Sequence, residues 1–217
     1  MDTFDINSIS AAVGAAGALG TACFGIVEAL KWTPLGEAGF GQIRAYLGHE
    51  LLSTLRVAYG AEYERLLRAQ YRQDSQHQTT IAKSLRQGVR LGLQPGNAEA
   101  VAGFLGSVQG TALKNAVANV ASGSVLTDEN RAAIGRFELA ADARIESALS
   151  RAQDVYLGAV RCTASVLAIG LAEVAAALLG ASWLKGLLVG VMAVPLAPIA
   201  NDVVAALQAA TKALRAR

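Results

Sequence analysis

Three long apolar runs constrain this chain more than any other feature of its sequence. They cover about residues 9–30, 163–180 and 186–207. Each approaches the roughly 20 residues that a helix needs to cross a lipid bilayer. The second and third runs are separated only by ASWLK, residues 181–185, so we predict that they form a tight helical hairpin. The first run stands alone, far upstream.

Composition favours a membrane protein built of helices. Of 217 residues, 53% are hydrophobic and only 17% are charged, and the mean hydropathy is positive, which is unusual for a soluble domain. The apolar positions show no period-2 alternation of the kind that a β-barrel requires. We therefore predict an all-α fold: a polytopic helical membrane protein with one isolated N-terminal span, a C-terminal transmembrane hairpin and a long helical cytoplasmic segment between them.

The charge pattern argues against a nucleic-acid partner and sets the predicted orientation. The formal net charge is only +2, and the basic residues alternate with acids. Lys31, Arg44, Arg151 and Arg161 lie near the span ends on one side, with the basic C-terminus, and Lys185 lies on the other. The positive-inside rule then places the N-terminus outside and the C-terminus in the cytoplasm. We expect an integral protein of a bacterial inner membrane, with the lipid bilayer as its surroundings.

The predicted organisation has seven segments. The first run is read as a retained span, because its leader MDTFDINS is acidic where a signal peptide begins with basic residues. The segments are a short external N-terminus (1–8), transmembrane helix 1 (9–31), a helical cytoplasmic domain (32–161), transmembrane helix 2 (162–180), an external hairpin turn (181–185), transmembrane helix 3 (186–207) and a basic cytoplasmic tail (208–217).

The middle segment shows helical periodicity interrupted by turns. Apolar residues recur every three or four positions over 43–67, which predicts one long amphipathic helix with Glu64 and Arg68 paired on its wet side. A shorter helix is predicted over 80–91. QPGN then makes a turn, with Asn97 as N-cap of a helix over 98–121.

The most regular pattern follows Thr127, which we predict to cap a helix whose first turn holds Asp128 and Glu129. Apolar residues step by three or four from there, and no proline occurs before residue 180. One helix is therefore predicted over 128–179, running into the second span. Its stripe needs a partner, either the 43–67 helix of the same chain or the same helix of a neighbouring copy.

Local motifs for catalysis or metal binding are missing. His49 and His77 have no further ligand at suitable spacing, and GEAGFG at 36–41 lacks the Lys-Ser or Lys-Thr of a phosphate loop. Cys23 and Cys162 are read as small apolar residues. We predict no metal and no cofactor and assign no catalytic residue, although residues distant in sequence can still form an enzyme site.

Small residues in the first span predict a helix-packing face. Gly14, Gly17 and Gly20 recur at every third position, which lets another helix approach closely. The alternative interpretation is that these glycines only reflect the composition of the chain.

Three acids lie within the predicted spans, and Glu173 is the most informative. An acid near a span centre costs roughly 2.5–3.5 kcal/mol on insertion scales, so Glu173 should face a helix, a partner or a water path. In a low-dielectric site it can be protonated at neutral pH, which permits a role in carrying protons. An interhelical hydrogen bond that only holds the helices together is the alternative. Glu28 is read as an interfacial residue beside Lys31.

The segment VPLAPIAND, residues 194–202, predicts a break in the third span. Pro195 and Pro198 each remove a helical hydrogen bond, and lipid cannot satisfy the freed carbonyls. Asn201 and Asp202 follow about one turn later. We predict a kink that faces inward and lines the inner mouth of a helical assembly. A straight span, with Asp202 reaching the lipid head groups, is the alternative.

The plan of spans resembles that of the TolQ, ExbB and MotA ion-channel subunits, which form rings that convert ion flow into work. GFLGSVQG at 103–110 is similar to a glycine-threonine motif of that family, but it lies in the polar middle segment here, and AVPLAPIAN at 193–201 resembles the proline-containing last span. The family's acid and threonines have no positional match, so the resemblance assigns no functional residue.

Two functions stay open. The first is a homo-oligomeric membrane protein that forms a pore or ion-conducting assembly, as the small-residue face, the acids and the broken third span indicate. The alternative is a non-conducting anchor or scaffold subunit that recruits a protein partner through its cytoplasmic helices.

Overall fold

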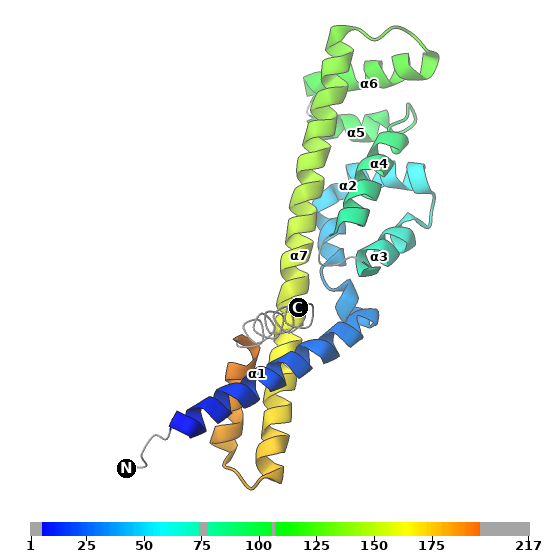
Figure 1. The fold of residues 1–217 in the computed structure, drawn as a ribbon. Coiled ribbons are helices and arrows are strands. Elements are labelled where there is room, and N and C mark those ends of the chain that lie inside the picture. The colour runs from blue at the N-terminus through cyan, green and yellow to red at the C-terminus, as the bar shows by residue number, and fades with distance from the viewer. Residues whose placement is uncertain (1–5, 74–77, 106, 196–217) are drawn as a thin grey trace, which may run out of the picture. The chain divides into compact units, whose positions relative to one another are not determined.

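The computed structural model describes residues 6–73, 78–105 and 107–195, and for residues 6–13, 24, 28, 31, 107 and 108 it describes the backbone alone. All regular elements in these ranges are helices, which confirms the predicted all-α class (Figure 1). The elements are α1 (Ile6–Ala29), the 3-10 helices η1 (Leu30–Trp32) and η2 (Pro34–Glu37), α2 (Phe40–Tyr59), α3 (Tyr63–Gln73), α4 (Thr79–Gly92), α5 (Ala98–Leu105), α6 (Ser107–Ser122), α7 (Asp128–Leu178) and a last helix over Trp183–Pro195.

The helices form two compact units, which differ in their polar content. One comprises residues 36–156, and the other comprises residues 1–35 together with 157–217. The ion pairs between described residues all join side chains from Glu37 to Glu146, and hence lie in the first unit. We call the first the polar unit and the second the apolar unit. Helix α7 contributes residues to both.

Helix α7 confirms the predicted helix over 128–179 within one residue. The backbone N–H of Asn130 donates to Thr127 Oγ1 at 3.2 Å, so Thr127 is the predicted N-cap. At the other end Gly180 has a φ of 66°, and the N–H of Ala181 donates to the carbonyl of Ala176 at 2.8 Å. This left-handed glycine closure ends the helix at Leu178 and places the turn at residues 179–182, earlier than predicted.

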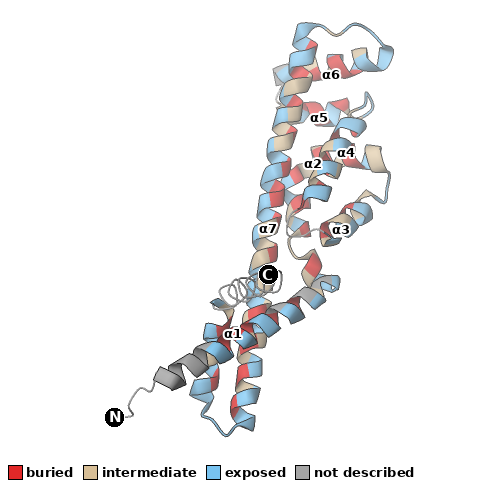
Figure 2. Ribbon diagram, in the orientation of Figure 1, coloured by how far each residue is buried: buried red, intermediate tan, exposed pale blue. Residues whose placement is uncertain are grey.

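The core of the polar unit lies between α7 and the helices beside it. Figures 1 and 2 show α2 to α6 along one side of α7, with its buried positions forming a stripe on that side. The stripe of α7 packs on apolar side chains of α2, so the partner of the α7 stripe lies in the same chain. The buried residues of these two helices are Phe40, Ile43, Leu47, Leu51, Leu55, Ala133, Phe137, Ala141, Ile145, Ala148, Leu149 and Ala152.

The predicted single helix over 43–67 is wrong, because the chain breaks after Tyr59. Gly60 has a φ of 79° and its N–H donates to the carbonyl of Arg56, so α2 ends there and α3 begins at Tyr63. The apolar stripe continues across the break because Leu67 packs on the same core as α2.

The predicted pair between Glu64 and Arg68 does not form. Instead Glu64 binds Arg44 at 3.4 Å, and Arg68 binds Glu37 at 3.1 Å. Once α3 is a separate helix that packs against neighbouring elements, its charged side chains reach partners outside it.

The predicted helix over 98–121 is also wrong in its continuity, since α5 and α6 are separate helices that pack on each other. Their approach is close: a β-carbon at Gly110 would lie 2.5 Å from the carbonyl oxygen of Ala102. The predicted helix over 80–91 is confirmed by α4.

Asn97 occupies the predicted N-cap position, since α5 begins at Ala98 and the N–H of Val101 donates to the Asn97 carbonyl at 3.2 Å, but its side chain bonds elsewhere. Its Oδ1 accepts from the backbone N–H of Gln94 at 3.0 Å, and its Nδ2 donates to the carbonyl of Gly92 at 2.6 Å. The amide therefore ties the turn back to the end of α4, because the open carbonyl of Gly92 is within its reach.

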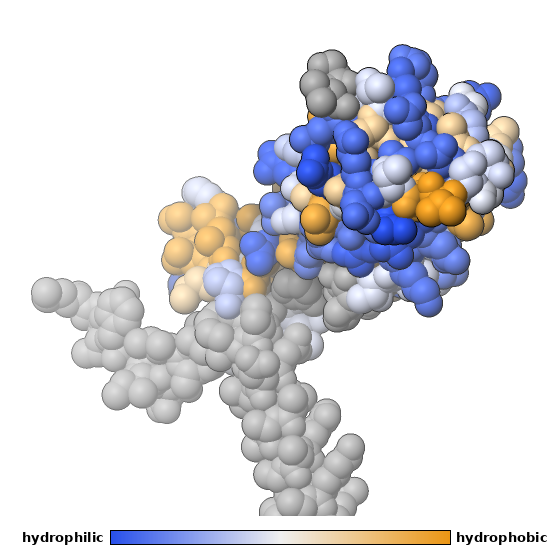
Figure 3. Space-filling model, turned by 90° about the horizontal axis from the view of Figure 1, so that it is seen from above, coloured by the Kyte–Doolittle hydropathy of each residue, from blue (hydrophilic) through white to orange (hydrophobic). Residues whose placement is uncertain are grey.

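Among the described residues, one helix is long and apolar enough to cross a membrane, judged by length and composition alone. This helix is α7, whose last part contains the predicted second span. The segments Gly14–Val27 and Trp183–Pro195 are apolar but shorter. All three membrane spans therefore remain predictions. Seen from the end at which α6 lies, the polar unit is mostly hydrophilic, with separate hydrophobic spots (Figure 3).

Candidate functional site

The structure describes some of the polar and proline residues that we predicted to matter for function completely, one by its backbone only, and others not at all. Glu173 lies on α7, less than two turns before its end, and Pro195 is exposed at the end of the last helix. Glu28 is described by its backbone only, within α1. Pro198, Asn201 and Asp202 lie outside the described residues. The predicted kink and its acid therefore remain predictions.

The candidate site is built where the last helix packs on α7 inside the apolar unit. Two glycines make this contact possible. A β-carbon at Gly186 would lie 2.9 Å from the Ala176 Cβ and 3.1 Å from the Ala172 carbonyl oxygen. At Gly190 it would lie 2.7 Å from the Ile169 Cα. The two backbones therefore approach closer than helices with larger residues at these positions could.

Alanines on α7 form the opposing surface. Ala164, Ala168, Ala172 and Ala176 recur every four residues and are all buried, so they share one face of the helix. Ala193 of the last helix is buried in the same cluster as Ala168. Small residues therefore line both helices where they pack, and we call this contact the seam.

Helix α1 packs on the same pair. Ala16 and Cys23 of α1 are buried in one cluster with Ala168 and Ala193. Of the glycines predicted as a packing face, Gly17 and Gly20 are buried. Gly14 is exposed, and a β-carbon added to it would meet nothing within 4 Å.

The carboxyl group of Glu173 lies beside this contact. A β-carbon at Gly186 would be 3.3 Å from the Glu173 Cδ, so the carboxyl group faces the backbone of the last helix. The residue as a whole is half-buried, but Oε1 is fully buried and has no hydrogen-bond partner in the described part of the chain. A buried acceptor without a partner costs about 1–3 kcal/mol, and more when it is charged. Such a group in a native structure calls for a functional or chemical explanation.

The sequence carries a signal for this site outside the packing face that we predicted in the first span. GLLVG at 186–190 has the four-residue glycine spacing that is typical of close helix packing in membranes. The alanines from 164 to 176 have the same spacing. The pattern shows that each helix has a small-residue face, but only the structure shows that these faces meet and that Glu173 borders them.

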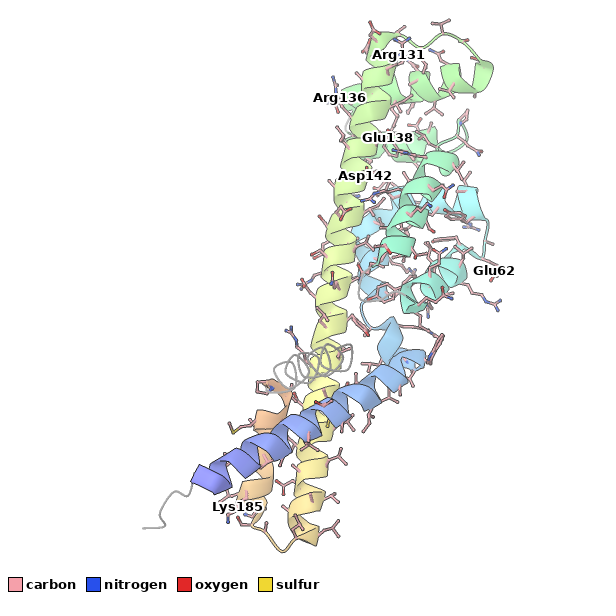
Figure 4. All side chains as sticks on the ribbon, in the orientation of Figure 1. Glu62, Arg131, Arg136, Glu138, Asp142 and Lys185 are labelled. Carbon is pink, nitrogen blue, oxygen red and sulfur yellow. The ribbon has the colours of Figure 1, made fainter. Side chains whose placement is uncertain are left out.

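Charged residues of the polar unit are engaged in holding its helices together. Arg86 of α4 pairs with Asp142 at 3.4 Å and with Glu146, and Arg90 pairs with Glu138 at 3.0 Å. Figure 4 shows Glu138 and Asp142 projecting from α7 on the side of α4. A hollow of about 380 Å³ between α4 and α7 has Arg86 and Glu146 as its charged lining residues, and because these two pair with each other they leave no free charge there for an ionic ligand.

Tyr71 joins α3 to two other segments of the polar unit. Its buried hydroxyl donates to the carbonyl of Ala38 at 2.8 Å and lies 3.2 Å from that of Ala152 on α7. Burial, followed by the proximity of Tyr156, raises the pKa of Tyr71 above its ordinary value. The neutral phenol thus links α3 to the segment at Ala38 and to α7 by hydrogen bonds.

No group of three or more His, Cys, Asp or Glu side chains that could hold a metal ion occurs in the described residues. His49 is exposed, and His77 lies outside the described ranges. Comparisons of the chain with protein-family models, with curated proteins and with solved structures found no match. The function is therefore argued from the geometry alone.

Proposed function

We propose that this protein is an integral membrane protein that assembles with copies of itself, and that the assembly conducts a small ion along a path that includes Glu173. The spans of this proposal are residues 9–31, 162–180 and 186–207, and the polar unit lies in the cytoplasm.

The exposed side chains of the apolar unit support the membrane location. Leu178 and Leu179 at the hairpin are 83% and 82% exposed, and Trp183 is 64% exposed. Only 22% of the most apolar window of α7 is buried, whereas the core helix of a soluble protein is mostly buried. Further exposed apolar residues of this unit are Ile26, Trp32, Val166, Leu171, Val174, Leu184, Leu187, Leu188, Val191 and Met192. Lipid is the solvent that such a surface fits.

The buried Oε1 of Glu173 is the single observation that carries the proposal of ion conduction. An ionisable group inside a membrane is retained when it has a function, because its insertion is unfavourable. Gly186 and Gly190 bring the last helix into close contact with α7 beside this carboxyl group, and Glu173 itself is only half-buried. The exposed part of Glu173 is open to a second copy, and we place the path between the two copies, so the proposal includes a homo-oligomer.

Purified full-length protein in liposomes tests this proposal. We expect ion flux in the wild type and at least a tenfold loss on Glu173→Gln, which is about 1.4 kcal/mol in the rate-limiting barrier. Glu129→Gln, an exposed acid of the polar unit, is the matched control and should leave flux unchanged. Asp202→Asn tests the residue predicted to line the inner mouth. A monomer in mild detergent, or flux that survives Glu173→Gln, would contradict the proposal.

Membrane topology is tested separately with a membrane-impermeant maleimide. The native Cys23 and Cys162 are first replaced, since Cys162 is exposed. A cysteine introduced at Lys185 should then react from outside intact cells, and one at Glu129 only after permeabilisation. Reaction of both from the same side would contradict the proposed hairpin.

The second candidate function is a non-conducting anchor that recruits a protein partner to the membrane. It is favoured by exposed apolar side chains of the polar unit that its core does not use, such as Leu139, which is 72% exposed on α7. This function predicts a stoichiometric complex of the full-length protein with a soluble partner, lost on Leu139→Glu, and no flux in liposomes. Retention of the complex in that variant would count against this surface.

A further inference from the structure

We propose that the exposed side of α7 in the polar unit binds the same side of a second copy of this chain, and that Arg151 of each copy pairs with Asp154 of the other. The inference rests on the proposed function in one respect. Two copies inserted in one membrane have the same orientation, so their α7 helices run parallel. It names a surface through which the proposed homo-oligomer forms.

The outer face of α7 is the side that the other helices of the polar unit leave exposed. Figure 2 shows α2 to α6 on one side of α7 and exposed positions on the other. Leu139 begins this face and is 72% exposed. The exposed positions that follow at three or four residues carry small side chains, namely Ala143, Ser147 and Ser150. Because packed helices lie closer when the side chains at the contact are small, this face admits another helix closely.

Arg151 and Asp154 are the charged groups at the end of the outer face. Both are exposed, and neither makes an ion pair in the described part of the chain. They line one hollow of about 500 Å³ together with Tyr46 of α2, so the two charges border the same space. The charged side chains of α7 just before them all have partners on α2 or α4. Those side chains are Glu138, Asp142, Arg144 and Glu146.

The order of the two free charges explains why they do not pair within the helix. They are three residues apart, which is the spacing of the pairs Glu62–Arg65 and Asp128–Arg131. In both of those pairs the acid comes first, which is the more favourable order on a helix, whereas on the outer face the base comes first. The two charges are therefore left for a partner outside the helix.

A second copy supplies the matching charges. In a twofold pair, each residue of one copy meets the equivalent surface of the other, and every contact is made twice. Arg151 and Asp154 are offset by about 4.5 Å along the helix axis at 1.5 Å per residue, which a long arginine side chain spans. Two ion pairs then form across the contact. Because one base and one acid cancel, this pair of charges gives no preference for a strongly acidic or basic partner.

Disulfide cross-linking of the full-length protein in liposomes tests the contact. The native Cys23 and Cys162 are first replaced, and Ser150→Cys then lies on the outer face. Oxidation should give a covalent dimer of this variant. Gln87→Cys, at an exposed position of α4, is the control and should stay monomeric. Absence of the Ser150→Cys dimer would overturn the inference.

Charge reversal in the Ser150→Cys background tests the proposed ion pairs. Arg151→Asp and Asp154→Arg each bring like charges together, so each should lower the dimer yield by at least about fivefold. Differently tagged chains that carry one reversal each should cross-link to one another when reconstituted together, because opposite charges meet again. Arg136→Asp, at an exposed arginine of α7, is the matched control and should leave the yield unchanged. Equal yields in all variants, or no recovery in the mixture, would overturn the pairing.

Flux measurements separate this inference from the proposed function. A charge-dependent dimer without flux supports the contact and overturns conduction. Flux in variants whose cross-linking is indifferent to charge reversal supports conduction and overturns the contact. A soluble partner that occupies the outer face and prevents the dimer would overturn the contact in favour of the second candidate function.

Discussion

Gly190 in the last helix lies so close to Ile169 of α7 that a β-carbon at position 190 would come within 2.7 Å of the Ile169 Cα. The obstacle is backbone, so the helices themselves must separate to admit a methyl group. We predict that Gly190→Ala lowers the stability of the protein in detergent by about 1–3 kcal/mol. Thermal unfolding followed by tryptophan fluorescence measures it.

The matched control for Gly190 is Gly170, on the exposed side of α7. A β-carbon there would meet nothing within 4 Å, so Gly170→Ala should be neutral or raise stability by up to about 1 kcal/mol through helix propensity. Equal losses of stability in the two variants would show that close packing against α7 does not explain why position 190 is a glycine.

Gly92 at the end of α4 predicts a similar effect in the polar unit. A β-carbon on Gly92 would overlap the carbonyl group of Thr54 on α2, and Thr54 is fully buried. Gly92→Ala should therefore destabilise the polar unit by about 2 kcal/mol or more, because backbone cannot rotate away as a side chain can. Circular dichroism melting is the measurement. Gly96→Ala lies in the adjacent turn, where the added methyl group is free of contacts, and should change the midpoint little.

Tyr71→Phe removes the hydroxyl group that joins Ala38 to Ala152. Loss of these hydrogen bonds at a buried site should lower the free energy of unfolding by about 1–3 kcal/mol. The ring contact with Phe40, at a centroid distance of 5.8 Å, does not involve the hydroxyl group and should survive the change. Denaturant unfolding at neutral pH measures the loss, and an unchanged midpoint would show that these hydrogen bonds do not stabilise the fold.

The raised pKa of Tyr71 also predicts a pH dependence. The folded chain holds the phenol proton more tightly than the unfolded chain, whose pKa is near 10.0. The stability due to Tyr71 is thus fully present below pH 10.0 and is lost as the pH rises through the folded pKa. Alkaline destabilisation should be smaller in Tyr71→Phe than in the wild type, with a remainder from Tyr59 and Tyr63, whose pKa values burial also raises.

Helix α2 is kinked at Gly48, and Arg144 of α7 contacts the residues around this kink. Gly48 has a non-helical φ of 72°, and Arg144 Nη1 lies 3.4 Å from the Leu47 carbonyl oxygen and 3.7 Å from Glu50 Oε2. Its guanidinium group also stacks 4.6 Å from the centroid of the Phe104 ring. Since this side chain is partly exposed, we predict a loss of only about 1 kcal/mol for Arg144→Met.

Arg136→Met is the control for Arg144. Arg136 is exposed on α7, and Figure 4 shows it projecting from the side opposite Glu138 and Asp142. The substitution should change the unfolding midpoint by no more than a few tenths of a kcal/mol. A larger loss at Arg136 than at Arg144 would contradict the role given to the kink.

Prediction from the sequence succeeded for features that depend only on residues close together in the sequence. The start of α7 was predicted from the side chain of Thr127, and its length from an uninterrupted apolar stripe. The same method failed at Gly60, because the stripe from α2 into α3 continues across the break. Periodicity reports which face is buried, and two helices that bury their faces in one core give the same pattern as one long helix.

The sequence by itself determined the helical class, the course of α7 and the small-residue faces at 164–176 and 186–190, because capping, periodicity and spacing are local properties. Tertiary structure alone decided that these two faces meet, that Gly186 lies against Glu173, and that Oε1 of this acid is buried with no partner among the described residues. Contacts between helices depend on how their backbones pack, and a single chain pattern is compatible with several packings. The candidate site at Glu173 forms only in the helix packing that this chain adopts.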